Sequence, residues 1–252
     1  MDPRIESHVM EIDRCNQRGG RMLSIRDLLD AGTLDRKMSE YLLAAISGGR
    51  SFLVGAMPGG AGKTTVMGAL LNFIPDIDIV PTVNGDVIRD GLDDETPRCY
   101  LAHEIGRGRW YAYIWGRDVE NFLHLTCRHM VAGNLHADDI EDVLSHDGID
   151  ESNITKLDLL IFLSVNGGLR GRSRRINSIL ENQGGRGTLA FKQIYSCRPP
   201  DGPFVYSGRP KLVTERELEW AGEVMESVLI DDLRTIGEVR SAVLKALPSR
   251  NI

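Results

Sequence analysis

The chain has 252 residues, of which 42% are hydrophobic and 26% are charged, and its formal net charge is -6. This balance is ordinary for a globular protein and supports a sizeable core. It excludes a polybasic protein that attracts polyanions through its overall charge, so we expect no nucleic-acid partner.

No apolar run approaches the ~18 residues that a membrane span requires, so we expect no membrane-spanning helix. Residues 1–22 are polar and lack the apolar segment typical of a signal peptide. The four cysteines are scattered without a C-x-x-C pair, which favours reduced thiols. We therefore expect a cytoplasmic protein.

Two helices and a strand are predicted before the middle of the chain. Ser24 and Asp27 form a capping-box-like pair, which predicts a helix over residues 24–32. Thr33 is expected to cap the next helix, which ends at a pair of glycines. The apolar segment RSFLVGAM, residues 50–57, predicts a strand that opens into a glycine-rich loop.

Predicted strands and helices then alternate. Helical patterns cover residues 63–74, 118–133 and 138–148, and apolar runs predict strands over residues 76–83, 98–105 and 156–165. The last of these runs, KLDLLIFLSV, is continuous, as expected for a strand buried on both faces. The alternation predicts an α/β sheet flanked by helices.

The end of the chain is predicted to differ from the α/β core. Residues 173–182 and 188–197 alternate in the manner of strands and predict an antiparallel pair, followed by a Pro/Gly-rich loop over residues 196–210. Residues 213–247 read as helical. We expect one domain with three parts: a polar segment (1–22), the core (23–213) and a C-terminal helical segment (214–252).

The segment GAMPGGAGKTT, residues 55–65, is close to the phosphate-binding pattern G-x-x-x-x-G-K-[ST], the P-loop. In such loops, N–H groups at a helix N-terminus hold phosphates, a lysine adds charge and a hydroxyl binds Mg²⁺. We predict that Lys63 binds the phosphates of ATP and that Thr64 is the metal ligand. The predicted nucleotide-binding residues are Pro58, Gly59, Gly60, Ala61, Gly62, Lys63, Thr64 and Thr65.

Met57 stands where the pattern has its first glycine. That position shapes the bend between strand and loop and supplies none of the donors that face the phosphates. Pro58 stiffens the same bend. We expect phosphate binding to survive, the alternative being a glycine-rich turn that binds nothing.

Two residues downstream are candidates for catalysis. Glu104 ends a predicted strand, at the edge where ligands bind in α/β sheets, and could position Mg²⁺ or the attacking water. His136 precedes a helix and could sense a γ-phosphate. The alternatives are a solvated strand-end glutamate and a capping or core histidine, and Asp138 reads as a helix cap.

Two further groups of residues have open interpretations. Cys99, His103, His124, Cys127 and His129 could form a zinc site, but their spacing is loose, and packing is the favoured interpretation. The basic run LRGRSRR holds Arg170, Arg172, Arg174 and Arg175. It reads as a solvated hairpin turn, with contact to phosphate or to a neighbouring subunit as the alternative.

The order of these motifs resembles that of the secretion motor ATPases, which serve type II and type IV secretion, pili and archaeal flagella. LSIRDLLDAG through GAGKTT is similar to the family's lead-in and Walker A loop. CYLAHEIGRG is similar to its Walker B segment, with Glu104 on the glutamate, and NLHADDIEDVL to its His box, with His136 on the histidine. KLDLLIFLSV and RGRSRRINSILE are similar to the strands that follow. The resemblance covers residues 23–195.

This resemblance implies a P-loop NTPase (RecA-like) sheet, ATP and Mg²⁺ as cofactors, and an ATPase. It also implies self-association into a homo-oligomer and a place in a secretion or pilus-type assembly, peripheral to a membrane through a partner. The chain departs from the family at Met57, at His103, where the family has glycine, and at the family's Asp box, which PTVNGD matches poorly. Because only about twenty residues precede the match, we expect the family's N-terminal domain to be missing.

Two other functions stay open. VNGDVIRDGL resembles the D-x-x-R segment of P-loop kinases, in which Asp86 would be the base on an acceptor hydroxyl and Arg89 would contact the substrate. The chain could also be a non-hydrolysing nucleotide-binding module that switches a partner.

Overall fold

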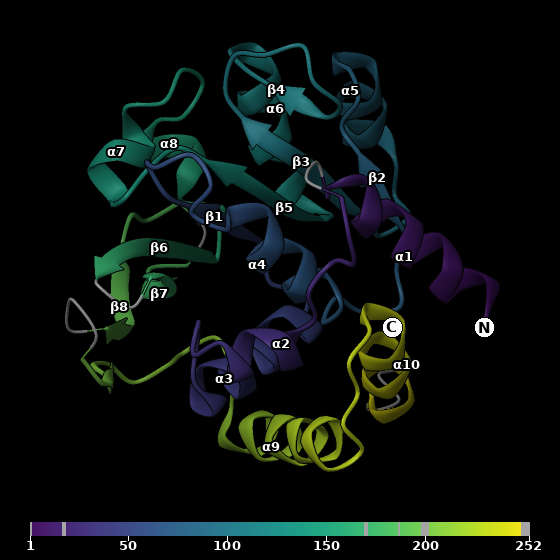
Figure 1. Cartoon of the computed structure of the whole chain (residues 1–252). Helices are drawn as coiled ribbons and strands as arrows, with labels where there is room; N and C mark the ends of the chain where they lie inside the picture. The colour runs from purple at the N-terminus through teal and green to yellow at the C-terminus, as the bar shows by residue number, and fades with distance from the viewer. Residues whose placement is uncertain (1, 17–18, 169–170, 186, 198–201, 248–252) are drawn as a thin grey trace.

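The computed structural model describes residues 2–16, 19–168, 171–185, 187–197 and 202–247. In this part of the chain a sheet of nine strands is flanked by helices (Figure 1). The strands are β1 (Phe52–Gly55), β2 (Ile79–Pro81), β3 (Cys99–Ile105), β4 (Tyr113–Ile114), β5 (Met130–Leu135), β6 (Leu159–Gly168), β7 (Gly171–Asn182), β8 (Phe191–Cys197) and β9 (Phe204–Tyr206). The helices are α1 (Pro3–Arg14), α2 (Ile25–Asp30), α3 (Arg36–Ser47), α4 (Lys63–Leu71), α5 (Gly85–Asp93), α6 (Arg117–His124), the 3-10 helix η1 (Leu125–Cys127), α7 (Ile140–Leu144), α8 (Glu151–Ile154), α9 (Glu215–Ile230) and α10 (Ile236–Ala246).

The order of the strands decides where a site can form. The sheet runs β2-β3-β5-β1-β6-β7-β8-β9, and β4 pairs with β3. From β2 to β6 neighbouring strands are parallel, whereas β7, β8 and β9 add antiparallel pairs. The carboxyl ends of β3, β5 and β1 therefore meet at one edge of the sheet, where ligands of α/β proteins bind. The predicted α/β sheet, with antiparallel strands after its core, is confirmed.

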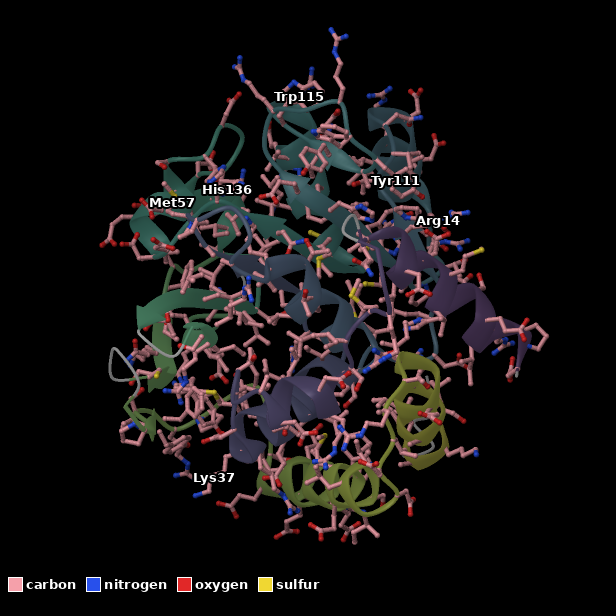
Figure 2. All side chains as sticks on the ribbon, viewed as in Figure 1. Arg14, Lys37, Met57, Tyr111, Trp115 and His136 are labelled. Atoms are coloured by element: carbon pink, nitrogen blue, oxygen red, sulfur yellow. The ribbon has the colours of Figure 1, made fainter. Side chains whose placement is uncertain are left out.

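The N-terminal segment, predicted only as polar, forms helix α1, which packs against α4, β2 and α10. Asp2 caps the helix by accepting a hydrogen bond from the Arg4 N–H at 2.8 Å. At the other end, the Cys15 Sγ lies 3.0 Å from Nε2 of His103, which is buried on β3. Arg14 donates to the hydroxyl of Tyr111 at 3.5 Å (Figure 2). Helix α1 thus braces the strand that carries Glu104.

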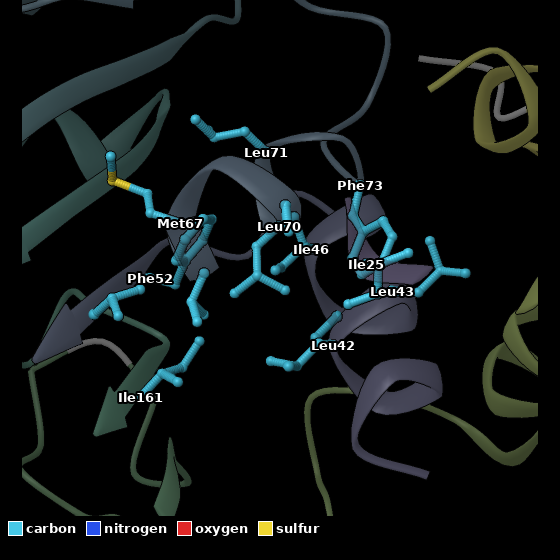
Figure 3. Close-up of a cluster of buried hydrophobic side chains, with 14 of the residues drawn as sticks. Ile25, Leu42, Leu43, Ile46, Phe52, Met67, Leu70, Leu71, Phe73 and Ile161 are labelled. Carbon is cyan, nitrogen blue, oxygen red and sulfur yellow. The ribbon is translucent and has the colours of Figure 1, made fainter. Parts of the chain in front are cut away.

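Alternation along β1 shows how the core is divided between the two faces of the sheet. Phe52 and Val54 belong to one buried cluster, with residues of α2, α3, α4, α9 and α10. Leu53 belongs to a second cluster, with residues of α5, α6 and α8. Figure 3 shows the first cluster, in which Phe52 lies near Met67 of α4. A central strand buried on both faces fits the predicted parallel architecture.

One predicted helix is wrong in its second half. The helix expected over residues 118–133 is α6 followed by η1, and the chain then forms strand β5 (Met130–Leu135) between β3 and β1. The apolar run MVAGNL is compatible with either structure, and pairing with strands on both sides decides it.

Smaller differences concern the ends of elements. The predicted capping box of Ser24 and Asp27 is confirmed. The cap of α3 is Asp35 rather than Thr33, because Asp35 accepts from the Met38 N–H at 2.8 Å. The helical segment predicted over residues 213–247 is two helices, α9 and α10, and the predicted loop before it contains β9.

None of the helices in the described ranges has the length and apolar character needed to cross a bilayer.

Two buried histidines make stability depend on pH. Burial and the nearby Arg240 lower the pKa of His8 from 6.5 to about 3. Burial lowers the pKa of His103 from 6.5 to about 4. Between pH 6.5 and pH 4 the unfolded chain therefore binds protons that the folded chain does not, so stability falls as the pH falls.

We expect the free energy of unfolding to drop by up to about 1.4 kcal/mol per pH unit for each histidine in this window. Urea unfolding of the wild type and of His103→Asn from pH 7 to pH 5 checks this, and the variant should show the smaller slope. Equal slopes for the two proteins would contradict the assignment to His103.

Candidate functional site

Three segments meet at the carboxyl edge of the parallel strands: the loop after β1, Glu104 near the end of β3, and His136 directly after β5. They come together because β5 pairs in parallel with both β1 and β3. A strand, β5, thus separates the glycine loop from Glu104. The side chains predicted for phosphate binding and for catalysis therefore share one site.

The glycine loop connects β1 directly to α4. Gly60 and Gly62 have φ angles of 80° and 100°, a left-handed conformation that only glycine adopts readily. Gly62 is the N-cap of α4, and the first turn of that helix holds no acidic residue. Lys63, Thr64 and Thr65 form this first turn. The helix thus presents its positive end without a side-chain anion, a suitable arrangement for a phosphate.

The bend after β1 accommodates Met57 because the hydrogen bonds that hold this residue are made by its backbone. Its N–H donates to Oδ1 of Asp138 at 2.8 Å, and its carbonyl accepts from Nδ1 of His136 at 3.0 Å (Figure 2). Its side chain is 51% exposed, and its φ angle is not positive. The bend therefore needs no glycine at this position. Asp138, predicted as a helix cap, holds this bend instead, and Asp139 caps α7.

Lys63, Glu104 and His136 form a compact group of charged and polar side chains. The buried Nζ of Lys63 lies 3.6 Å from Oε2 of Glu104 and 3.4 Å from Nδ1 of His136. Nε2 of His136 lies 3.9 Å from Oε1 of Glu104. The ammonium also lies 3.5 Å from Nε2 of His136 and donates a hydrogen bond of 3.4 Å to the carbonyl of Ala56.

Burial shifts the pKa values of Lys63 and Glu104 in opposite directions. Burial lowers the pKa of Lys63, although the charge of Glu104 acts to raise it. Burial raises the pKa of Glu104, and the charge of Lys63 opposes this shift. Each charge therefore stabilises the other in a poorly hydrated place.

The carboxylate of Glu104 also has unused hydrogen-bonding capacity. Its Oε1 is buried and accepts no hydrogen bond from any described residue. Buried acceptors normally have a donor, so this oxygen is placed to accept a hydrogen bond from a water molecule or from a ligand of a bound metal ion. The residues present therefore fit a Mg²⁺–nucleotide complex, with Thr64 in the first turn of α4.

The solvated environment predicted for Arg174 fits its exposed side chain, but this residue also contacts the glycine loop. It lies on β7, and its Nε donates to the carbonyl of Gly60 at 2.9 Å. Its neighbour Arg175 instead donates to the carbonyl of Gly202 and lies 4.0 Å from the ring of Phe204. Arg170 and the side chain of Arg172 lie outside the described residues. The basic composition of the run was the only sequence signal, and it did not separate these roles.

Asp86 and Arg89 do not join the group around Lys63. Both belong to α5, where they form an ion pair with each other and are exposed to solvent. Helix α5 follows β2, which β3 and β5 separate from β1. Three strand spacings of about 4.8 Å place this pair roughly 14 Å across the sheet from the loop.

The cysteines and histidines of the zinc alternative have separate environments. Cys99 is buried in the core, and His103 contacts Cys15. Nε2 of His129 lies 2.8 Å from the carbonyl of Gly91, and Cys127 is exposed. In the ranges that the structure describes, no three His, Cys, Asp or Glu side chains gather closely enough to hold a metal ion.

No protein-family model matches the chain, and no curated protein matches its sequence. Similar solved structures include the VirB11 ATPase from the Brucella suis type IV secretion system in complex with sulphate, with 17% identity and a TM-score of 0.40 over 62% of this chain and 54% of that one. They also include the ATPase DotB of Legionella pneumophila, with 13% identity and a TM-score of 0.39 over 82% and 54% of the two chains. DotB of Yersinia pseudotuberculosis has 12% identity and a TM-score of 0.42 over 87% and 63%.

The chain thus spans between 54% and 63% of the length of these structures. All three are ATPases, and the first belongs to a type IV secretion system. At these TM-scores the likeness adds nothing to what the geometry of the site supports.

The close packing behind the loop gives a stability test with a matched control. A Cβ atom on Gly55 would lie 2.6 Å from the carbonyl oxygen of Ala137 and 2.7 Å from Cδ1 of Phe162, whereas a Cβ atom on Gly59 would have nothing within 4 Å. We expect Gly55→Ala to lower the free energy of unfolding by about 1–3 kcal/mol. Gly59→Ala should change it by less than about 0.5 kcal/mol. Urea unfolding measures both, and equal effects would contradict the packing described here.

Proposed function

We propose that the chain binds ATP with the loop of residues 58–65 and hydrolyses it with Mg²⁺. The observation that supports this most strongly is the convergence of Lys63, Glu104 and His136 at the N-terminus of α4. Lys63 lies within 3.6 Å of both other side chains. A lysine, a carboxylate and a helix N-terminus are the parts that P-loop ATPases use.

Lys63 and the loop glycines would hold the phosphates in this proposal. The N–H groups of the loop and of the first turn of α4 supply donors, and the ammonium supplies the charge. Thr64 would ligate the Mg²⁺, and the metal ion would neutralise charge on the terminal phosphates. Binding of phosphates would draw Lys63 partly away from Glu104, since both anions attract the same ammonium.

Glu104 would orient the attacking water and accept its proton. The position supports this role, because the buried Oε1 has no hydrogen-bond donor among the described residues. Burial raises its pKa, which makes the carboxylate a better proton acceptor than a solvated one. His136, half exposed beside Lys63, would give the N–H that it donates to the Met57 carbonyl to the terminal phosphate instead, and would so report the phosphate to the bend at Met57.

The motif order extends the proposal beyond the single chain. This order supports self-association and action as a motor-like ATPase at a secretion or pilus-type assembly. The protein would be cytoplasmic and would attach to the membrane through a partner. A kinase that uses Asp86 and Arg89 is less well supported, because these residues pair with each other on α5, away from the loop.

The first test compares ATP binding and steady-state phosphate release in the wild type, Lys63→Ala and Glu104→Gln. Lys63→Ala should weaken ATP binding about 10- to 100-fold, because a charged hydrogen bond to phosphate is lost. Glu104→Gln should keep the affinity and lower turnover about 100-fold or more, because the amide cannot accept the proton.

Asp86→Asn is the control and should leave both quantities unchanged. Binding without turnover in the wild type would favour the nucleotide-dependent switch. ATP use that requires an added acceptor and disappears in Asp86→Asn would favour the kinase.

A second test addresses the missing glycine. Because the side chain of Met57 is exposed and only its backbone holds the bend, Met57→Gly should change the dissociation constant for ATP by less than about twofold. Asp138→Ala removes the acceptor of the Met57 N–H and should weaken binding up to about tenfold. Tighter binding by Met57→Gly with no effect of Asp138→Ala would show that the side chain itself limits the loop.

A further inference from the structure

The loop has a second cationic partner that does not belong to the P-loop pattern. Strand β6 pairs with β1 as far as Phe162 and then continues past the end of β1 to Gly168. Its partner β7 returns alongside this extension, with Arg174 opposite Val165. The β6–β7 hairpin therefore overhangs the carboxyl edge of the sheet and brings Arg174 against the loop.

Two contacts fix the position of Arg174 on the loop. Its Nε donates to the carbonyl of Gly60 at 2.9 Å. Its Cδ would lie 3.3 Å from a Cβ atom on Gly62, the N-cap of α4. The aliphatic part of the side chain thus covers the N-terminus of α4, while the guanidinium is held beside the loop.

Two cationic side chains and the N-terminus of α4 gather beside the loop. The N-terminus of α4 is positive, and Lys63 adds an ammonium beside it. Of the nearby carboxylates, Glu104 faces Lys63, and Asp138 accepts from the Met57 N–H. In the described part of the chain, Arg174 has no carboxylate partner, and its Nη groups make no hydrogen bond. A cation placed beside a helix N-terminus is unfavourable unless an anion lies between them.

We propose that Arg174 is a phosphate-binding residue that acts within the same chain, held by Gly60 through Nε and binding the nucleotide phosphates through its Nη groups. This inference rests on the proposed function, because it needs a nucleotide in the loop. The guanidinium suits the role, since it can give one N–H to a carbonyl while the others face a phosphate in a planar fork. A lysine ammonium is a single charged point, so it cannot contact the carbonyl and the phosphate together with fixed geometry.

The test measures ATP affinity in the presence of Mg²⁺ by titration calorimetry, with the thermal midpoint of the nucleotide-free protein measured alongside. Arg174→Ala should weaken ATP binding at least about tenfold. Arg174→Gln keeps a side-chain N–H for Gly60 but loses the charge, and it should weaken binding to a similar extent. Both variants should reduce the dependence of ATP affinity on salt concentration, because one ionic contact is lost.

Arg175→Ala is the matched control, since Arg175 contacts Gly202 and Phe204 instead of the loop. Its ATP affinity should stay within about twofold of the wild type. Wild-type affinity in Arg174→Gln, or a lowered thermal midpoint in Arg174→Ala with unchanged affinity, would overturn the inference and leave Arg174 as a brace of the loop. Absence of ATP binding by the wild type would reject the proposed function and this inference together.

Discussion

The buried ion pair between Lys63 and Glu104 links the two halves of the site. Lys63 begins α4 and Glu104 lies near the end of β3, and β5 separates their strands. Removing one member would leave an uncompensated buried charge, which typically destabilises a protein by about 3–5 kcal/mol. The pair therefore holds the helix and the strand in register across β5, and the rest of the site is arranged around it.

The support of the loop comes mainly from outside its own sequence. Asp138 and His136 hold the backbone of Met57 from the segment after β5, and Arg174 holds the carbonyl of Gly60 from β7. The segment after β5 on one side of β1 and the β6–β7 hairpin on the other thus hold the loop. This distribution explains why a methionine is accommodated where the P-loop pattern has glycine: the bend is fixed by partners of its backbone.

A third support reaches the site from the N-terminal helix. His103 precedes Glu104, and its imidazole fills the space beside Cys15 and the ring of Tyr111, 5.1 Å away between ring centroids. Asn134 on β5 donates to the carbonyl of His103 at 2.9 Å. The residue that departs from the glycine of the secretion ATPases is thus a packed contact between α1, β3 and β5. Helix α1 and the strand that carries Glu104 consequently depend on each other for burial of their polar groups.

Local chemistry was sufficient to predict the elements that carry their own signals. The capping pair of Ser24 and Asp27 contains the interaction that defines it. The continuous apolar run of β6 and the glycine–lysine–threonine loop have a local composition typical of a buried strand and of a phosphate-binding turn, so the sequence sufficed to predict them. Glu104 could be chosen because it ends a predicted strand at the edge where ligands bind, whereas His136 was chosen from its place before a predicted helix and from the His-box resemblance. Residues 130–135 and Arg174 could not be assigned in this way. Whether MVAGNL forms a helix or a central strand depends on pairing with β3 and β1, and the place of Arg174 depends on how far the β6–β7 hairpin extends past β1. Those contacts join residues far apart in the chain, so only the tertiary structure decided them.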